Sequence, residues 1–245
     1  MQNVEFADAH CHLNLFEDPA KAVEEAIAAG VGLLVCSGDS AKDNTECLKI
    51  AEAKHVFSTI GIGPDFACKD LRFIDSIKNL ALANKPKVVG IGEIGLDTKI
   101  ADQGICDMKT QEAAFVRQTR IAKELQMPAV IHARGALDLA IEILVREAPQ
   151  KAMFHFFEGN AEQALYVAEK GYLVSLPPFV NRERKRIIST LDIKSIVVET
   201  DSPVAGKSPQ DVIKLVNEIA KIKNIDAETA ARKITQNIRN LFSIY

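Results

Sequence analysis

The sequence contains no run of about 18 or more apolar residues, the length that a membrane-spanning helix needs. Its N-terminus, Met1-Gln2-Asn3-Val4-Glu5, lacks the basic start and the short apolar stretch of a secretory signal. Together these two absences predict a cytosolic protein that does not insert into a membrane.

The cysteines are odd in number and include no CxxC pair, whereas a zinc knuckle or a disulfide framework requires closer or even spacing. We therefore expect reduced thiols, most of them packed in the interior. The five cysteines are Cys11, Cys36, Cys47, Cys68 and Cys106.

Basic residues are not in excess, because 30 Lys and Arg against 33 Asp and Glu give a formal net charge of −3. This balance disfavours a broad, strongly basic nucleic-acid-binding surface, although an enzyme can still meet DNA at its pocket alone. No low-complexity stretch and no linker rich in Pro, Gly and Ser divides the 245 residues. We expect one domain, residues 1–245, of a size that can bury a sizeable core.

Short β-branched apolar runs alternate with segments of helical periodicity along the chain. Helix ends are recognisable between the runs: Asp18-Pro19 begins one helix and Gly30 ends it, residues 110–125 have helical spacing, and Ser208-Pro209-Gln210-Asp211 begins another helix. Eight strands alternating with helices predict an α/β fold with a mostly parallel sheet, either a closed (β/α)8 barrel or an open doubly wound sheet. The eight predicted strands are residues 4–13, 32–36, 56–62, 88–94, 129–132, 152–156, 172–176 and 196–199.

The first predicted strand ends in Asp8-Ala9-His10-Cys11-His12. Side chains alternate across a strand, so His10 and His12 share one face and can bind one metal ion together. Two histidines on a half-exposed strand are the structural alternative. In a β/α barrel, the carboxyl ends of the strands are where an active site forms.

Two further histidines end predicted strands: His132 follows an apolar run in the fifth strand, and His155 follows one in the sixth. Each alone fits a hydrogen-bonded core histidine. Four of the five histidines at strand carboxyl ends form a pattern that packing does not explain. His55 begins a strand, at the opposite rim, and we interpret it as structural.

Two carboxylates complete the candidate metal site. Glu93 ends the fourth strand inside an apolar, glycine-rich run, where a buried carboxylate is costly unless it is paired or bound to a metal. Asp201 ends the eighth strand, and its structural alternative is a turn or helix-capping residue before Pro203. Four imidazoles with two carboxylates suit Zn²⁺, Mn²⁺ or Co²⁺ better than Mg²⁺.

Taken together, these segments resemble the TatD-type metal-dependent deoxyribonucleases of the amidohydrolase superfamily. The matching segments occur in the family's order over nearly the whole chain, and their joint occurrence is far more specific than any one of them. They are Asp8-Ala9-His10-Cys11-His12-Leu13, Gly92-Glu93-Ile94-Gly95-Leu96-Asp97, Val130-Ile131-His132-Ala133-Arg134, His155-Phe156-Phe157-Glu158-Gly159, Glu199-Thr200-Asp201-Ser202-Pro203 and Asn237-Ile238-Arg239-Asn240-Leu241-Phe242.

The resemblance implies a (β/α)8 TIM barrel and a divalent-metal-dependent hydrolase that cleaves phosphodiester bonds of DNA through a metal-activated water. One or two ions (Zn, Mn, Co or Mg) would be bound. The first would be held by His10, His12, Glu93 and Asp201, and the second by Glu93, His132 and His155. Glu93 and Asp201 would be the catalytic residues, since Glu93 bridges the two ions and Asp201 orients or deprotonates the water.

Other positions carry weaker expectations. Arg134, two residues beyond His132, is a candidate substrate-phosphate contact, with a surface salt bridge as the alternative. Glu199 is a candidate substrate contact. Glu199 and Asp8 are also candidates for orienting the metal ligands through hydrogen bonds, with a plain structural role as the alternative for both. The basic cluster at residues 181–186 is either a border of the substrate pocket or a solvated helix face.

The sequence departs from the family at three positions. Gly63 stands where a histidine precedes proline in the family, and Glu158 stands where Ser or Thr is usual. Asn14 replaces a usual aspartate. Glu158 would repel a phosphodiester unless it is paired or turned away.

Two alternatives to a deoxyribonuclease therefore stay open. The same metal centre could hydrolyse a small-molecule amide, ester or phosphoester, which the net charge, Gly63 and Glu158 favour. A non-catalytic binding protein on the same fold is the other alternative. No exposed heptad pattern indicates an obligate protein partner.

Overall fold

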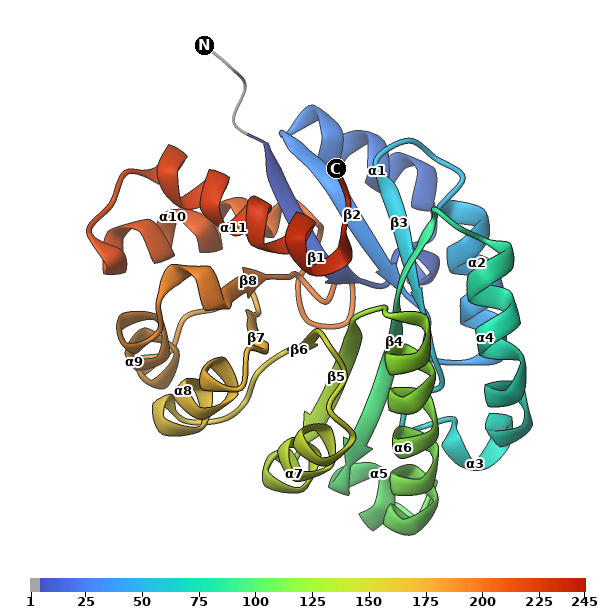
Figure 1. Cartoon of the computed structure of the whole chain (residues 1–245). Helices are drawn as coiled ribbons and strands as arrows, with labels where there is room; N and C mark the ends of the chain where they lie inside the picture. Colours follow the sequence, from blue (N-terminus) through green and yellow to red (C-terminus); the bar gives the residue numbers. More distant parts are fainter. Residues whose placement is uncertain (1–4) are drawn as a thin grey trace.

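The structure, a computed structural model, describes residues 5–245 and contains all eight predicted strands (Figure 1). They are β1 (Phe6–Cys11), β2 (Val31–Ser37), β3 (Val56–Ile60), β4 (Val88–Asp97), β5 (Ala129–Arg134), β6 (Ala152–Phe154), β7 (Leu173–Leu176) and β8 (Ile196–Val198). Every neighbouring pair from β1–β2 to β7–β8 is parallel, and the strands follow one another in chain order. The expectations for the N-terminus and for Val4 lie outside the described residues.

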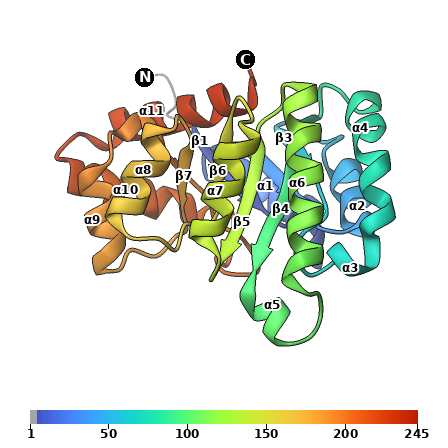
Figure 2. The same ribbon diagram turned by 60° about the horizontal axis from the view of Figure 1, so that its bottom comes forward.

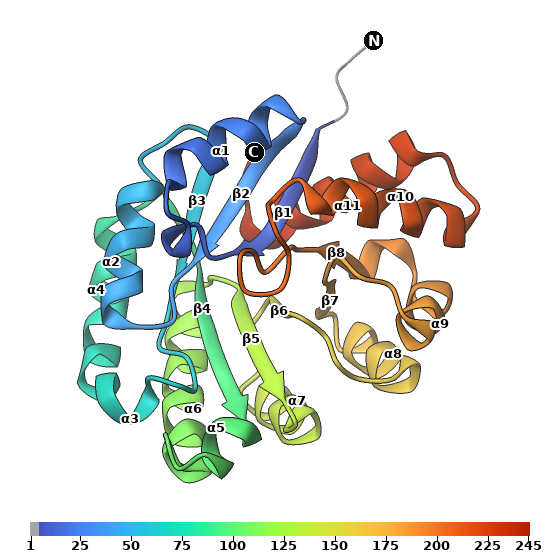
Figure 3. The same ribbon diagram turned by 180° about the vertical axis from the view of Figure 1, so that it is seen from behind.

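The two ends of the sheet meet, which distinguishes a barrel from an open sheet. Beyond β8, the backbone N–H of Asp201 donates to His10 O at 2.9 Å, and the N–H of His12 donates to Ser202 O at 2.8 Å. The buried carboxylate of Asp8 accepts the backbone N–H of Thr200 at 2.9 Å. Figure 3 shows the segment after β8 beside β1. The fold is a (β/α)8 barrel, as the sequence predicts, and the doubly wound alternative is wrong.

Helices surround the sheet on the outside (Figures 1 and 2). They are α1 (Pro19–Ala28), α2 (Ala41–Ile50), α3 (Ala67–Asp70), α4 (Ile74–Ala83), α5 (Thr98–Asp102), α6 (Met108–Leu125), α7 (Leu137–Glu147), α8 (Ala161–Glu169), α9 (Arg182–Thr190), α10 (Asp211–Lys223) and α11 (Ala227–Phe242). Short 3₁₀ turns lie at Leu13–Leu15, Leu71–Phe73 and Ile193–Ser195. Within residues 5–245, no helix combines the length and the apolar character needed to cross a membrane.

The predicted helix signals hold at α1 and fail in part at α10. Asp18 caps α1 by accepting the N–H of Lys21 at 3.0 Å, and Gly30 follows the helix with φ 99°, a conformation that favours glycine. Helix α10 begins at Asp211 and not at Ser208, because residues 208–210 form a turn in which Asp211 N–H donates to Ser208 O at 3.0 Å.

Helix α11 covers the amino-terminal rim of the barrel. In Figure 2 it lies at one end of the barrel and α5 at the other. Lys151, just before β6, donates from Nζ to Asn240 O at 2.5 Å, and the guanidinium of Arg239 pairs with Glu5 at 2.6 Å. The buried side chains of α11, among them Ile234 and Phe242, join the core. Burial of a large apolar side chain such as these two contributes about 1.5–3 kcal/mol. With α11 over this rim, the carboxyl ends of the strands are left open for a site.

The expectation of five reduced thiols is wrong for two cysteines. Cys68 in α3 and Cys106 before α6 form a disulfide across 38 residues, while Cys11, Cys36 and Cys47 are free and buried. Sequence spacing did not reveal the pair. The two cysteines come together because the loops after β3 and β4 follow neighbouring strands.

Candidate metal centre

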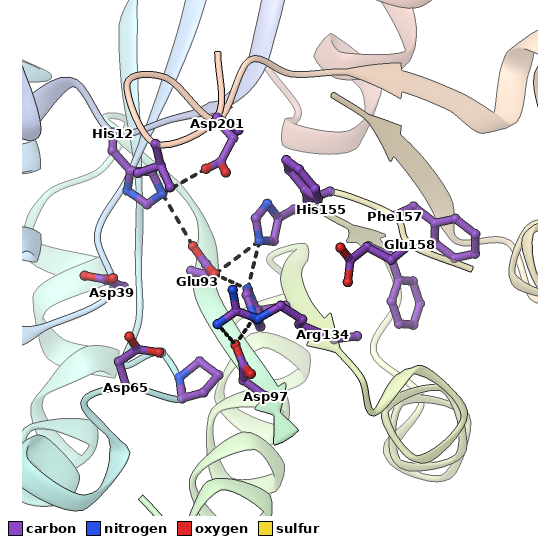
Figure 4. Close-up of a pocket in the computed structure, with 18 of the residues that line it drawn as sticks. His12, Asp39, Asp65, Glu93, Asp97, Arg134, His155, Phe157, Glu158 and Asp201 are labelled. Carbon is purple, nitrogen blue, oxygen red and sulfur yellow. Dashed lines mark hydrogen bonds and ion pairs between the residues drawn. The ribbon is translucent and has the colours of Figure 1, made fainter. Parts of the chain in front are cut away.

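The six predicted ligands come from different parts of the chain and meet at the carboxyl end of the barrel (Figure 4). His10 lies in β1 and His12 directly follows it, Glu93 lies in β4, and His132 lies in β5. His155 follows β6 and Asp201 lies beyond β8. Most of these side chains are buried, because strands covered by helices on the outside direct alternate side chains into the barrel.

The first donor group consists of His10, His12, Asp201 and one oxygen of Glu93. The Nε2 atoms of the two histidines are 3.2 Å apart. Asp201 Oδ1 lies 3.2 Å from His12 Nε2 and 3.6 Å from His10 Nε2. Glu93 Oε2 lies 3.3 Å from His10 Nε2 and 3.7 Å from His12 Nε2. A tetrahedral zinc ion with bonds of about 2.0–2.2 Å spaces its donors about 3.3–3.6 Å apart, so this group fits a divalent cation.

The second donor group uses the other oxygen of Glu93. Oε1 lies 2.7 Å from His132 Nδ1 and 3.1 Å from His155 Nε2, and these two nitrogens are 3.1 Å apart. Three donors on one side leave the remaining positions of an ion open to water or substrate, as in catalytic sites. The carboxylate of Glu93 therefore connects two groups of donors.

The second nitrogen of each imidazole also has a partner. His12 Nδ1 lies 3.1 Å from Ser37 O, and His10 Nδ1 lies 3.0 Å from Ser37 Oγ. His155 Nδ1 lies 3.2 Å from Glu199 Oε1. Such partners fix the ring orientation and the tautomer of a metal-binding histidine.

Asp97 is a functional residue that sequence analysis missed. Its Oδ2 lies 2.9 Å from His132 Nε2 and 2.6 Å from Arg134 Nη2, while its Oδ1 accepts the N–H groups that begin α5. The alternation within β4 was a usable signal, because Glu93 and Asp97 are four residues apart and share one face of the strand.

The charges of the centre support one another in the absence of metal. Burial disfavours an ionised Glu93, but the imidazoles of His155, His10 and His132 outweigh it and hold the pKa of Glu93 well below its usual range. Burial likewise opposes ionisation of Asp201, yet His10 and His12 lower its pKa.

The imidazoles show the reciprocal effect. Burial lowers the pKa of His12, but the hydrogen bond that its ring donates to Asp201 and the charge of Glu93 raise it to about 9. For His132, burial is outweighed by Asp97 and Glu93, and its pKa is also about 9. Without a cation, protons on these rings balance the buried carboxylates.

Glu199 and Asp8 are buried and do not line the pocket at the carboxyl end of the barrel. Glu199 is fully buried behind His155, where it also accepts Ser175 Oγ–H at 2.5 Å, which corrects the expectation of a substrate contact. It is missing from the pocket lining because β8 directs it behind the ligands. Asp8 joins β1 to Thr200 and has the structural role considered from the sequence.

The donors open into a pocket of about 450 Å³, a volume typical of small-ligand sites. Arg134 lines this pocket, and although it is paired with Asp97 its side chain remains 43% exposed. Arg134 forms an ion pair, as the alternative interpretation expected, although its partner Asp97 is buried; the substrate-phosphate contact stays a prediction for this accessible side chain. His55 lies on the opposite rim, with Nδ1 2.9 Å from Gly32 O.

Three carboxylates without a basic partner among the described residues also line the pocket: Asp39, Asp65 and Glu158. Glu158 is exposed and directed toward the pocket in Figure 4, so it is not turned away. A Cβ on Gly63 would lie 3.1 Å from Asp39 Cβ, so Asp39 occupies the space next to this glycine. Burial, followed by the charge of Glu93, raises the pKa of Asp39 to about 8.

Comparisons with known proteins agree with this geometry. Residues 7–243 match the model of the family described as TatD related DNase. An uncharacterized metal-dependent hydrolase of Methanocaldococcus jannaschii is 30% identical over 99% of this chain and 98% of its own. The human protein named deoxyribonuclease TATDN3 is 28% identical, with 98% and 95% covered. The crystal structure of the Escherichia coli TatD homologue YjjV superposes with a TM-score of 0.89 and 22% identity over the whole of both chains.

Proposed function

The chain belongs to the TatD-related DNase family, and from that premise we propose that it hydrolyses phosphodiester bonds of DNA at a centre of two divalent cations that share Glu93. The metal dependence and the hydrolase class come from the family and its relatives. The observation that carries the two-ion proposal is the division of Glu93, whose two oxygens lie in different donor groups.

Divalent cations held by these residues would supply positive charge that polarises the phosphoryl group and lowers the pKa of water. The protein residues then have separate tasks. Asp201 uses Oδ1 among the imidazoles, which leaves Oδ2 to orient water and accept its proton as the water oxygen bonds to phosphorus. The bond from phosphorus to the leaving alcohol oxygen breaks, and that oxygen takes up a proton.

Arg134 is suited to hold the phosphate. Its Nη2 donates to Asp97, which fixes the planar guanidinium, and the side chain lines the pocket and remains 43% exposed. A guanidinium recognises a non-bridging pair of phosphate oxygens with two parallel hydrogen bonds. Asp97 therefore serves both the second donor group and substrate binding.

We propose Zn²⁺, Mn²⁺ or Co²⁺ as the bound ion in preference to Mg²⁺, because four of the six donor residues are imidazoles. Activity measured after removal of metal and reconstitution with each ion tests this preference. Equal or higher activity with Mg²⁺ alone would contradict it.

The test of the function is cleavage of single-stranded DNA by purified, metal-loaded protein. His132→Ala is expected to abolish cleavage, because it removes a donor that faces Glu93. His55→Ala removes an imidazole from the opposite rim and is expected to retain activity. Equal activity in the wild type and His132→Ala would identify a contaminating nuclease and overturn the proposal.

A second candidate is hydrolysis of a small-molecule ester or amide, and the unpaired carboxylates of Asp39, Asp65 and Glu158 favour it. Turnover of small esters or cyclic amides without any cleavage of DNA would establish it. A non-catalytic binding protein is the remaining alternative. It would require that no ion binds and that Asp201→Asn changes neither activity nor stability.

We also propose that the protein works in the cytosol, where glutathione keeps most thiols reduced. The Cys68–Cys106 disulfide makes this proposal testable. Fractionation of cells combined with alkylation of free thiols before lysis would locate the protein and report its redox state. Recovery outside the cytosol with the bond intact would contradict the proposal.

A further inference from the structure

Two aromatic rings stand together at one edge of the metal pocket. Phe156 lines the pocket and directly follows His155. Phe179 lies in the loop between β7 and α9, and 45% of its surface is exposed. The ring centroids of the two phenylalanines are 5.6 Å apart with an interplanar angle of 62°.

The position of Phe156 is tied to the metal centre. Its φ is 44°, in the left-handed region that bulky residues rarely adopt, so surrounding contacts must hold it there. The backbone N–H of Phe156 donates to Glu199 Oε1 at 2.6 Å, and the same oxygen lies 3.2 Å from His155 Nδ1. Glu199 therefore holds the backbone of Phe156 and the ring of a predicted metal ligand in one arrangement. The rings of His155 and Phe156 are 6.3 Å apart.

A buried guanidinium supports the two rings from behind. Arg184 of α9 is only 7% exposed, and its guanidinium carbon lies 4.3 Å from the centre of the Phe179 ring and 5.5 Å from that of Phe156. Its Nη1 donates to Phe179 O at 3.2 Å, while its Nε has no hydrogen-bond partner among residues 5–245. Burying this charge is costly, and the contacts that it gains fix the two phenylalanines.

The surroundings of the rings match a nucleic acid in charge. Arg182 and Lys185 of the same helix are exposed, whereas Arg186 is paired with Glu183 at 3.2 Å. They belong to the basic cluster identified in the sequence, which makes up the first half of α9 and is absent from the pocket lining. Phosphates of a strand that leaves the pocket past Phe179 would therefore meet positive charge, whereas the pocket interior carries unpaired carboxylates.

We propose that Phe156 and Phe179 form a stacking site for the nucleobase next to the scissile phosphate of single-stranded DNA. This inference rests on the proposed function. A nucleobase is the occupant that fits, because the exposed ring of Phe179 contacts Phe156 of the pocket lining, and the exposed cations of α9 begin three residues further along the chain. Aromatic platforms bind bases of any sequence, since every base has a π-face.

The test compares three substrates: a thymine dinucleotide with both bases, the same dinucleotide without its first base, and the same dinucleotide without its second base. For the complete dinucleotide, Phe179→Ala is expected to raise KM about 5- to 150-fold with little change in kcat, as loss of one stacked base does elsewhere. The dinucleotide without the stacking base is expected to have the same KM in wild type and variant. Phe179→Trp should restore the low KM.

Tyr166→Ala is the matched control. Tyr166 is 43% exposed on α8 and lines a groove against α7, outside the metal pocket. Its removal takes away an aromatic ring of equal exposure, so KM for every dinucleotide is expected to stay unchanged. A melting curve of each variant checks that folding is intact.

A binding measurement separates stacking from catalysis. In the Asp201→Asn protein, a dinucleotide carrying 2-aminopurine is expected to lose fluorescence on binding, because stacking quenches this base. Adding Phe179→Ala should remove the quenching. If a hydrophobic peptide occupies the site and removal of the base does not change binding of the dinucleotide, the ligand is a protein and the proposal is overturned.

The outcomes distinguish the inference from the function on which it rests. If wild-type protein cleaves the dinucleotides and Phe179→Ala changes KM equally with and without each base, the stacking site is overturned and the function stands. If the metal-loaded wild type cleaves none of them and no DNA, the proposed function fails and the inference fails with it.

Discussion

Asp97→Asn tests whether the second donor group depends on the charge behind it. The amide retains Oδ1, which accepts the N–H groups of Lys99 and Ile100 at 2.8 and 3.2 Å, so the start of α5 is preserved. The change acts on the other atom, because an NH₂ group would replace the oxygen that lies 2.9 Å from His132 Nε2 and 2.6 Å from Arg134 Nη2.

The expected magnitude follows from these contacts. An NH₂ group cannot accept from the guanidinium of Arg134, and it requires His132 to present an unprotonated Nε2 in place of a donor. Loss of such a ligand-orienting partner weakens metal binding about 10- to 100-fold, which corresponds to ~1.4–2.7 kcal/mol. The group of His10 and His12 does not contact Asp97, so its affinity is expected to change much less.

Calorimetric titration of metal-free protein with Zn²⁺ or Mn²⁺ measures both affinities. The expected result is one site of nearly wild-type affinity and one weakened site, together with a higher KM for a phosphodiester because Arg134 loses its partner. Asp75→Asn, which removes an exposed carboxylate paired with Arg117, is the matched control. Unchanged affinity at both sites, in a protein that melts normally, would refute the reasoning.

Three further predictions concern charge, protons and the disulfide. Glu158→Gln is expected to lower KM for polynucleotides about fivefold, the equivalent of ~1 kcal/mol for one removed repulsion. The effect should shrink in high salt. A variant that binds DNA no better than the wild type would show that the carboxylate does not face the strand. Because the pKa of His12 and of His132 is raised to about 9 without metal, cations compete with protons there. Metal affinity should therefore rise as the pH rises toward 9, with protons released on binding. Calorimetry in buffers of different ionisation enthalpy measures this release, and binding without release of protons would contradict the prediction. Cys106→Ser should lower the free energy of unfolding by up to about 4 kcal/mol under oxidising conditions, as closure of a 38-residue loop predicts. With reductant present, the variant and the wild type should be equally stable. If they are equally stable under oxidising conditions too, Cys68 and Cys106 are not joined.

The sequence was informative about the fold because periodicity is local. All eight strands lie where apolar runs predicted them, and the ends of α1 follow from Asp18 and Gly30. Strand count alone could not distinguish a barrel from an open sheet. That difference depends on contacts between β1 and the segment after β8, such as Asp8 with Thr200, which lie at opposite ends of the chain.

The candidate site was predictable where strand position determined which way a side chain faces. The rule that strand carboxyl ends meet led to His10, His12, Glu93, His132, His155 and Asp201, and the structure brings all six together. Interactions that depend on the exact distance between neighbouring strands and loops could not be predicted from the sequence. The role of Asp97 depends on His132 and Arg134 in the next strand, and burial of Glu199 depends on the position of His155.

The pair of Phe156 and Phe179 belongs to the same class of features. Nothing in the sequence indicates that residues in two different loops share a buried arginine. The basic cluster looked like a single feature in the sequence, but helical spacing separates it. Arg184 points inward at the two rings, while its neighbours are exposed.

The central claim is that six side chains bind two cations through a shared Glu93. Anomalous X-ray scattering from crystals soaked in Zn²⁺ or Mn²⁺ tests it most directly. We expect two peaks, one among His10, His12, Asp201 and Glu93 Oε2, and the other between Glu93 Oε1, His132 and His155. Well-diffracting crystals with no peak in this pocket, or with peaks held by other residues, would contradict it.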